Sequence, residues 1–371
     1  MNGQDRTWRP TVVVVGGFLG AGKTTLILEA ARRLEERGVR AAVVLNDQGR
    51  ELVDMALAER SRITAGEVTG GCFCCRFSDL LQVMDGLREL RPEVIFAEPV
   101  GSCTDIAATV LAPLREEFDR YRVAPLAVLV DPARAESLTV VDADGHMAFL
   151  FGKQLDEADL ICMTKADLYA DANKPDAKTT KTNWLDANQL KAIVEKPVRY
   201  LSAKTGQGVD AWLDEVLAGG YERNAAFLDI DYEQYARAEA ALAWLNLSLR
   251  FVPERAMLPV AVAGQLMDGL DAALTEAGIR IVHLKLMNAT PAGWVKAALC
   301  ANGEEPAVEE VLDASPTEVH ELVVNLRAVG EPGEVDMIVR GEVAKMAGRV
   351  GEMRLDCFSP APPVPERRIT G

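Results

Sequence analysis

Short apolar runs alternate with helical patterns through the first 218 residues of the chain. The run Val12–Val15 is continuously apolar, which is typical of a parallel strand buried on both faces. Residues 25–37, which follow the next loop, place apolar side chains at helical spacing. The same pattern predicts strands at 11–16, 40–46, 93–98, 124–130, 159–164 and 197–202. Strands that alternate with helices indicate an α/β fold with a doubly wound, mostly parallel sheet.

The pattern changes after Gly219-Gly220, so we expect a first domain over residues 1–220 and a linker over 221–237. A smaller α+β domain over 238–358 is predicted, with a ferredoxin-like core and one extra strand. Its expected strands lie at 241–251, 280–288, 294–300, 319–328 and 351–357, and its expected helices at 258–277 and 332–347. Residues 170–186 are predicted to be an exposed loop, and residues 359–371, with four prolines, a loose tail.

The chain has 371 residues and a net charge of −16, from 40 basic and 56 acidic side chains. This balance argues against a nucleic-acid-binding protein. Met1–Pro10 lacks the apolar region of a signal peptide, and no apolar run is long enough to span a membrane. We therefore expect a cytoplasmic protein, in which the seven cysteines do not form a disulfide framework.

The segment Gly17–Thr24 fits the phosphate-binding pattern G-x-x-x-x-G-K-[ST] and lies between the predicted strand and helix. Lys23 is expected to reach the β- and γ-phosphates, and the Thr24 hydroxyl to bind Mg²⁺. The backbone expected to surround the phosphates belongs to Gly17, Gly20, Ala21, Gly22, Lys23, Thr24 and Thr25. An ordinary glycine-rich turn is the alternative, which the complete strand, loop and helix context disfavours.

Glu98 follows the predicted strand 93–98, where side chains face the ligand crevice of a parallel sheet. Beside a phosphate loop, such a carboxylate can hold Mg²⁺ through water or orient the attacking water. A surface carboxylate is the alternative. Ser102 and Asp105 are predicted to form a capping box for the next helix.

Two short motifs after later strands favour guanine as the base. An Asp such as Asp167, in Thr164-Lys165-Ala166-Asp167, can accept hydrogen bonds from guanine N1–H and the exocyclic amino group. The Lys165 stem can lie across the base. In the second motif, Ser202-Ala203-Lys204, the Ala203 backbone N–H can donate to guanine O6. Each motif alone is also compatible with a helix N-cap.

Cys72, Cys74 and Cys75 form the most distinctive cluster, directly after Gly70-Gly71. An extended strand would point Cys75 away from the other two, so convergence on one ion requires a turn. Thiolates select soft or borderline ions, and three of them leave one tetrahedral position for water, a side chain or a receiving protein. Buried inert cysteines and a redox-sensing cluster are the alternatives.

Asp47 lies in Asn46-Asp47-Gln48-Gly49-Arg50, after the second predicted strand, where GTPases place a switch segment. We consider that Asp47 approaches either the Mg²⁺ or the cysteine cluster. The alternative is an ordinary turn, for which Asn, Asp and Gly are common residues.

Together these motifs resemble the CobW-type GTPases, a metallochaperone group similar to the urease and hydrogenase nickel-insertion GTPases. The resemblance covers roughly the first 215 residues. It runs through Gly16–Thr25, Asn46, Gly71–Cys75, Glu98–Gly101, Gln154 with Ala158-Asp159, Lys165–Asp167 and Ser202–Lys204. It implies GTP hydrolysis coupled to handling of Zn²⁺ or Co²⁺, with the cysteine triplet as the metal site. The chain departs from the family in having Asp47 and Arg50 where glutamates are usual, and Thr164 where the guanine motif usually begins with Asn.

The leading hypothesis is therefore a GTP-dependent metallochaperone that delivers Zn²⁺ or Co²⁺ to a client metalloenzyme or cofactor-assembly protein. Lys23, Glu98 and Asp47 are the expected catalytic residues, hydrolysis is expected to be slow without a partner or metal, and a homodimer is considered. The client would dock on the C-terminal domain. The alternative is a GTP-switched chaperone or activator of a corrinoid- or metal-dependent enzyme that carries no metal itself. A small-molecule kinase is disfavoured, because no Arg-rich lid is visible.

Overall fold

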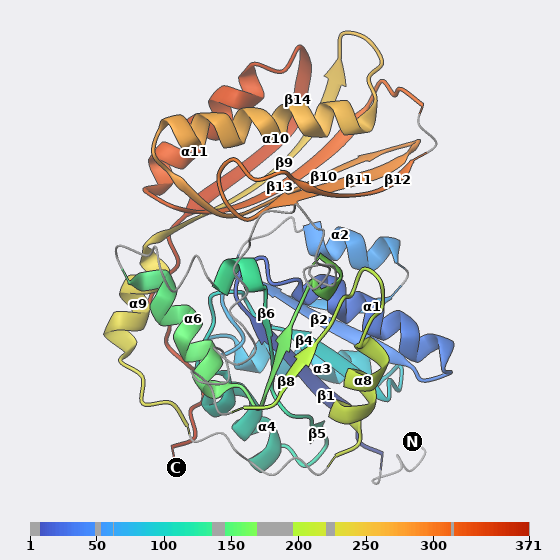
Figure 1. Ribbon diagram of the computed structural model, residues 1–371, viewed down its shortest axis with the longest axis vertical. Coiled ribbons are helices and arrows are strands. Elements are labelled where there is room, and N and C mark those ends of the chain that lie inside the picture. The colour runs from blue at the N-terminus through green and yellow to red at the C-terminus, as the bar shows by residue number, and fades with distance from the viewer. Residues whose placement is uncertain are drawn as a thin grey trace, which may run out of the picture. The chain divides into compact units, whose positions relative to one another are not determined.

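The computed structural model describes residues 8–48, 53–61, 63–135, 145–168, 196–219, 227–312 and 315–370. The chain forms two compact units, neither of which is a single continuous segment (Figure 1). The first unit comprises Met1–Asp47, Ala58–Tyr235 and Pro363–Gly371. The second comprises Gln48–Leu57 and Ala236–Pro362. The predicted loop at 170–186 lies outside the described residues.

The first unit is built on a parallel sheet, in the order β3-β2-β4-β1-β6-β7-β8, with β5 also paired to β1. This confirms the doubly wound fold. Its strands are β1 (Thr11–Gly17), β2 (Ala41–Asp47), β3 (Thr64–Thr69), β4 (Val94–Glu98), β5 (Arg122–Val123), β6 (Ala127–Val130), β7 (Leu160–Met163) and β8 (Val198–Tyr200). Because all are parallel, the residues that follow them collect at one edge of the sheet.

The helices of the first unit connect these strands (Figure 1). They are α1 (Lys23–Glu36), α3 (Phe77–Arg88), η1 (Ala107–Leu111), α4 (Ala112–Glu116), α6 (His146–Glu157), η2 (Ala166–Leu168) and α8 (Val209–Leu217). A further helix, α9 (Tyr232–Ala240), includes the last residues of the expected linker 221–237. None of the described helices is long and apolar enough to cross a membrane.

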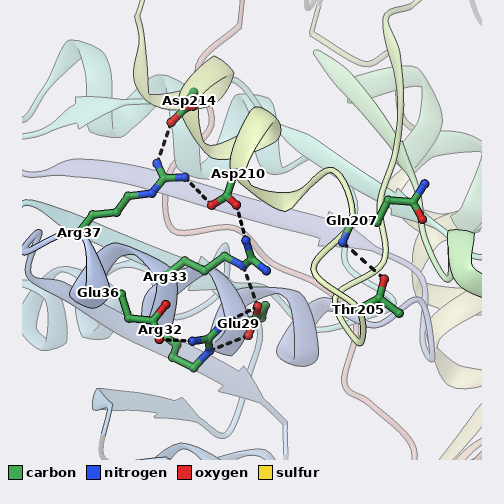
Figure 2. A network of polar contacts seen from close by, with 9 residues as sticks. All are labelled: Glu29, Arg32, Arg33, Glu36, Arg37, Thr205, Gln207, Asp210 and Asp214. Atoms are coloured by element: carbon green, nitrogen blue, oxygen red, sulfur yellow. Dashed lines mark hydrogen bonds and ion pairs between the residues drawn. The ribbon is translucent and has the colours of Figure 1, made fainter.

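Ion pairs join α1 to α8 (Figure 2). Arg37 donates to Asp214 at 2.7 Å, and both Arg33 and Arg37 pair with Asp210. Gly206, just before α8, has φ +79°, and a Cβ on it would collide with the Arg33 guanidinium. Since α1 follows the phosphate loop and α8 follows Ser202–Lys204, this network ties together the two ends of the predicted nucleotide site.

The second unit is an antiparallel sheet in the order β12-β11-β10-β13-β9-β14. Its elements are β9 (Leu242–Pro253), α10 (Pro259–Glu276), β10 (Arg280–Thr290), β11 (Gly293–Leu299), β12 (Ala307–Leu312), β13 (His320–Val329), α11 (Pro332–Ala344) and β14 (Gly348–Phe358). The four strands β10-β13-β9-β14 with α10 and α11 form the predicted ferredoxin-like core. The addition is a hairpin, β11 and β12, rather than one extra strand.

The two faces of this sheet differ in chemistry. Alternate residues of β9, β10 and β13, such as Leu247 and Leu284, form one apolar core with residues of α10 and α11. Both helices lie over the same face of this sheet (Figure 1). The polar side chain of Asn325, on the other set of positions in β13, accepts a hydrogen bond from Val53 N at 3.0 Å. Lys285 donates to Asp54 at 2.6 Å. Both partners lie at the start of α2 (Val53–Arg60), so the chain that follows β2 joins the C-terminal sheet.

The last described residues are not a loose tail. Residues 363–370 pack within the first unit, where Ile369 N donates to Ala108 O at 3.0 Å. Arg368 Nε donates to the buried Asp105 carboxylate at 2.8 Å, and the Tyr232 hydroxyl donates to the same oxygen at 2.6 Å. The predicted capping box is therefore wrong, because η1 begins without a side-chain cap and Asp105 binds these two groups instead.

Glu157, at the end of α6, generates a prediction about stability and pH. Its carboxylate is buried and accepts a hydrogen bond from Ala107 N at 3.0 Å, and burial raises its pKa to about 8 from an ordinary value of 4.5. Between these pH values the folded chain holds a proton that the unfolded chain has lost. Stability therefore falls as pH rises through this window. As pH rises from 5 to 8, the free energy of unfolding of Glu157→Gln should increase by up to about 4 kcal/mol relative to that of the wild type.

The measurement is urea unfolding at several pH values, followed with a probe in the first unit. Glu89→Gln is the matched control, because Glu89 is exposed. Parallel stability curves for the wild type and Glu157→Gln would contradict the assignment of this slope to Glu157.

Candidate nucleotide and metal site

The phosphate loop joins β1 to α1 through three glycines with positive φ, Gly17, Gly20 and Gly22. Gly17 has φ +132°, and a Cβ there would lie 2.5 Å from Leu129 O. Gly22, with φ +90°, precedes the first turn of α1, whose backbone N–H groups form an anion site. Lys23 Nζ donates to Gly17 O at 2.9 Å and to Phe18 O at 3.4 Å, so its ammonium group lies over the loop. This arrangement suits a bound polyphosphate.

Thr24 and Glu98 are brought together at the carboxyl ends of β1 and β4. The Thr24 hydroxyl donates to Glu98 Oε1 at 3.1 Å, and both side chains are buried. Two oxygen donors at one point next to a phosphate loop fit a hard cation such as Mg²⁺.

The turn that follows Glu98 packs against the phosphate loop. A Cβ on Gly101 would lie 3.1 Å from the Cα of Leu19, so the two backbones approach closely. Gln154 of α6 is buried and donates through Nε2 to Gly101 O at 3.0 Å and to Cys103 O at 2.8 Å. The turn from Glu98 to Cys103 is thus held between the phosphate loop and α6.

At the predicted base-binding end, Asp167 and Ser202 meet, since the Ser202 hydroxyl donates to Asp167 Oδ1 at 2.6 Å. Thr164 instead reaches the phosphate loop, where its hydroxyl donates to Ala21 O at 2.9 Å. Lys165 has an unusual φ of 55° and pairs with the buried Asp131 at 2.6 Å.

Asp131 comes directly after β6, and Glu98 is the last residue of β4, so the two carboxylates occupy similar places in the sheet. The sequence gives no clear signal for Asp131. Ala203 is half-buried and Lys204 is exposed, both in the turn after β8.

The three cysteines of the cluster converge on one point. The sulfur–sulfur distances are 2.9 Å for Cys72–Cys74, 3.3 Å for Cys72–Cys75 and 3.7 Å for Cys74–Cys75. The turn that the sequence required is present: Cys75 N and Arg76 N both donate to Cys72 O, and Gly70 has φ +76°. We call residues 70–76 the cysteine turn.

Asn46, at the end of β2, anchors the cysteine turn. Its Nδ2 donates to Val68 O at 2.9 Å and to Gly71 O at 2.8 Å, and its Oδ1 accepts a hydrogen bond from Phe73 N at 2.9 Å. Asp47, the next residue, is in register with Thr69, directly before the cysteine turn. The sequence pointed to this segment, but it did not show that Asn46 makes the connection. Arg50 lies outside the described residues.

A fourth cysteine, Cys103, contacts the cluster and was not predicted. Hydrogen bonds from Cys103 first, and then from Cys74 and Cys75, lower the pKa of the Cys72 thiol well below its usual value. The hydrogen bond to Cys72 raises the pKa of Cys74 well above its usual value and that of Cys75 to about 11. The shared hydrogen bonds therefore favour the charged form of Cys72 and disfavour the charged forms of Cys74 and Cys75.

The end of the chain crosses this cluster, and we call residues 363–369 the C-terminal strap. Val364 N donates to Cys75 Sγ at 3.2 Å, and Glu366 N donates to Cys74 O at 2.9 Å. The Glu366 carboxylate accepts hydrogen bonds from Ser78 N at 2.8 Å and Ser78 Oγ at 2.6 Å. The strap thus supplies both a backbone N–H to a sulfur and an anchor at the start of α3.

Most of the residues that form this site lie in a span that matches a known protein family. Residues 11–194 match the sequence family described as CobW/HypB/UreG, nucleotide-binding domain. This part of the chain belongs to the CobW/HypB/UreG family. The matched span includes the phosphate loop, the cysteine turn, Glu98 and Asp167, and it ends before β8.

Individual proteins of known name are similar to this chain. The chain is 31% identical over 179 residues to the zinc chaperone YjiA of Escherichia coli (strain K12), covering 46% of this chain and 54% of that protein. It is 32% identical over 216 residues to the zinc chaperone CobW of Sinorhizobium sp, covering 52% and 56%. The chain thus spans about half the length of these curated relatives. The crystal structure of Zn(II)-bound YjiA GTPase from E. coli aligns over 93% of this chain and 99% of that chain, with 16% identity and a TM-score of 0.37.

The role of Asn46 can be tested with the isosteric change Asn46→Asp. The new carboxylate would face Val68 O and Gly71 O without a proton to donate, and its charge would oppose the charged form of Cys72. The pKa of the Cys72 thiol should therefore rise. The measurement is the ultraviolet absorbance of thiolate against pH in metal-free protein.

Asn302→Asp is the matched control, because Asn302 also donates twice and accepts one backbone N–H, but in the second unit. It should cost stability without moving the thiolate titration. Identical titrations for both variants would show that Asn46 does not organise the cysteine turn.

Proposed function

We propose that this protein is a GTP-hydrolysing metallochaperone that carries Zn²⁺ or Co²⁺ on Cys72, Cys74 and Cys75 and delivers it to a client metalloenzyme or cofactor-assembly protein. One observation carries the proposal: the ligand sulfurs of all three cysteines lie within 4.8 Å of one another, in the same unit as the phosphate loop. The names of the relatives support it. YjiA and CobW are called zinc chaperones, and a urease accessory protein UreG is also similar to the chain.

The sulfur geometry supports a thiophilic ion. In a tetrahedral zinc site with Zn–S bonds of about 2.3 Å, neighbouring sulfurs lie about 3.8 Å apart. The three sulfurs are now 2.9–3.7 Å apart, so a small outward movement would accommodate the ion. Because the pKa of Cys72 is lowered, its sulfur would lose its proton most readily, and the ion would displace the protons of the other two.

The nucleotide side supports GTP hydrolysis. Lys23 would place its positive charge on the β- and γ-phosphates, and Asp167 would select guanine. Thr24 and Glu98 are the residues that would hold Mg²⁺, an ion that neutralises phosphate charge. Glu98 would hold Mg²⁺ or orient the attacking water, and Asp47 is the other carboxylate expected to be catalytic.

Coupling between nucleotide and ion would pass through the end of β2. Asn46 holds the cysteine turn, Asp47 is the neighbouring switch residue, and the chain enters the second unit at Gln48. The α2 residues Val53 and Asp54 are bound to the C-terminal sheet. A nucleotide-dependent shift at Asp47 would therefore reach both the ion site and the unit assigned to docking the client.

This coupling predicts that metal affinity depends on the bound nucleotide. Titrations of Zn²⁺ or Co²⁺ should give tighter binding with a non-hydrolysable GTP analogue than with GDP, by about 5–150-fold. By reciprocity, the ion should strengthen binding of the analogue by the same factor. Competition with a chromophoric chelator measures the ion affinity.

The triple variant Cys72→Ser, Cys74→Ser, Cys75→Ser should lose tight metal binding and keep GTP binding. Equal ion affinity with the GTP analogue, with GDP and with neither would exclude the coupling. Another outcome would favour the GTP-switched chaperone that carries no metal. In that case, elemental analysis of protein purified without added metal finds no bound ion, and titration finds no affinity for one.

Guanine selection by Asp167 can be tested with Asp167→Asn. The amide can donate a hydrogen bond where the carboxylate only accepted, so it should reject guanine and accept xanthine, which has a carbonyl at that edge. We expect GTP binding to weaken at least about 100-fold and xanthosine triphosphate binding to improve. Asp336→Asn is the control, because Asp336 is also ion-paired, with Arg340, but lies in the second unit. Unchanged nucleotide preference in Asp167→Asn would assign the base to other residues.

A further inference from the structure

We propose that residues 364–366 of the C-terminal strap form a latch over the ion site, which holds Cys75 in place and opens when an ion enters or leaves. This inference rests on the proposed metal site of Cys72, Cys74 and Cys75. It adds a control on exchange of the ion, supplied by a segment almost 300 residues away in the sequence.

The latch contacts both the cysteine turn and the start of α3. The backbone N–H of Val364 donates to Cys75 Sγ at 3.2 Å. The backbone N–H of Glu366 donates to Cys74 O at 2.9 Å. The Glu366 carboxylate accepts hydrogen bonds from Ser78 N at 2.8 Å and from Ser78 Oγ at 2.6 Å. The Val364 side chain is 73% exposed, so its contact with the sulfur is made by the backbone.

Cys75 is the sulfur at which an ion would be exchanged. Cys72 and Cys74 are buried, at 5% and 1% exposure, whereas Cys75 is only partly buried. A ligand of the client or of a chelator has to approach the ion as a protein sulfur leaves it, so exchange begins at the most accessible sulfur. The latch contacts this sulfur and no other of the three through a printed hydrogen bond from its backbone.

The hydrogen bond to Cys75 suits a site that holds an ion. A backbone N–H can donate to a thiol sulfur, and it donates more strongly to a thiolate. Groups that hydrogen-bond to a metal ligand fix its orientation and strengthen binding of the metal. The N–H of Val364 would therefore retain the Cys75 thiolate on the ion, and opening of the latch would release that constraint.

The strap is built so that the latch can open while the rest stays bound. Arg368 donates at 2.8 Å to Asp105, whose side chain is 1% exposed, and loss of this partner would leave a buried charge without compensation. The contact between Glu366 and Ser78 is exposed, so water can replace it at little cost. The latch is thus the part of the strap that opens first, with Arg368 as the anchor.

Prolines on both sides of Val364 prepare the latch to close again. Val364 lies between Pro363 and Pro365, and a residue that precedes proline favours extended backbone. Prolines also restrict the open chain, so less conformational entropy is lost when the latch returns to the cysteine turn. An extended, preorganised segment of this kind can open and close repeatedly without refolding.

The test is the rate of ion transfer from the full-length Val364→Pro variant. Proline has no N–H and places a ring carbon toward Cys75, yet it adopts the extended backbone that the neighbouring prolines already favour. Transfer of Zn²⁺ or Co²⁺ to excess chromophoric chelator should be about tenfold or more faster than in the wild type. Ion binding should also be faster, because one opening serves both directions. Stopped-flow absorbance measures both rates.

Val364→Ala is the matched control. It keeps the N–H and removes only an exposed side chain, so both rates should equal those of the wild type. Glu366→Ala is a second variant that opens the latch at its contact with Ser78 without changing the residue next to the sulfur. It should also speed both rates, and it keeps the test valid if Val364→Pro folds poorly. The number of ions bound and the GTP affinity should be unchanged in all three variants.

The outcomes separate the latch from the proposed metal site. Wild-type rates in both Val364→Pro and Glu366→Ala would overturn the latch and leave the three-cysteine site intact. Faster release with an unchanged binding rate would overturn control of exchange and make the strap a stabilising contact only. Equal acceleration in Val364→Ala would overturn the role of the N–H. Wild-type protein that binds neither Zn²⁺ nor Co²⁺ would overturn the metallochaperone function itself.

Discussion

The carboxamide of Asn46 is the contact on which the arrangement of the site depends. Three backbone groups of the segment from β3 to the cysteine turn are satisfied by one side chain at the end of β2. A buried amide with three partners has little freedom to adjust, since every lost hydrogen bond leaves a polar group without water. The sulfurs are therefore fixed to the edge of the sheet at which the residues predicted to bind nucleotide also collect.

The residues of the predicted nucleotide site also collect at one edge of the parallel sheet. Glu98, Asp131 and Thr164 end or follow strands β4, β6 and β7, and each contacts a residue of a nucleotide motif: Thr24, Lys165 or Ala21. Because the strands are parallel, their carboxyl ends lie at the same edge, and this brings residues far apart in sequence into contact. The network between α1 and α8 adds a second connection, away from the sheet, between the phosphate and base ends (Figure 2).

Sequence patterns predicted what is local. The phosphate loop, its strand and its helix are encoded in one short segment. Convergence of Cys72, Cys74 and Cys75 was expected to need a turn, and the turn is present. Strand β3 was missed because Thr64–Thr69 is a partly exposed edge strand with a glycine and a glutamate, and Gly66 is needed where the strand meets Val83 of α3. No apolar periodicity marks such a strand.

What the sequence did not predict depends on contacts over long separations. Cys103 looked like an isolated cysteine, and Val364 and Glu366 looked like part of a proline-rich tail. Their roles appear only when β2, β4 and the end of the chain meet around the same thiols. Since the chain leaves the first unit after Asp47 and the strap returns to it at Pro363, neither unit corresponds to a continuous segment. The cysteine turn is thus bound by residues from both ends of the chain: Asn46 holds its backbone, and the strap binds Cys74 O and Cys75 Sγ. The positions of the three sulfurs therefore depend on contacts that no short segment of the sequence contains.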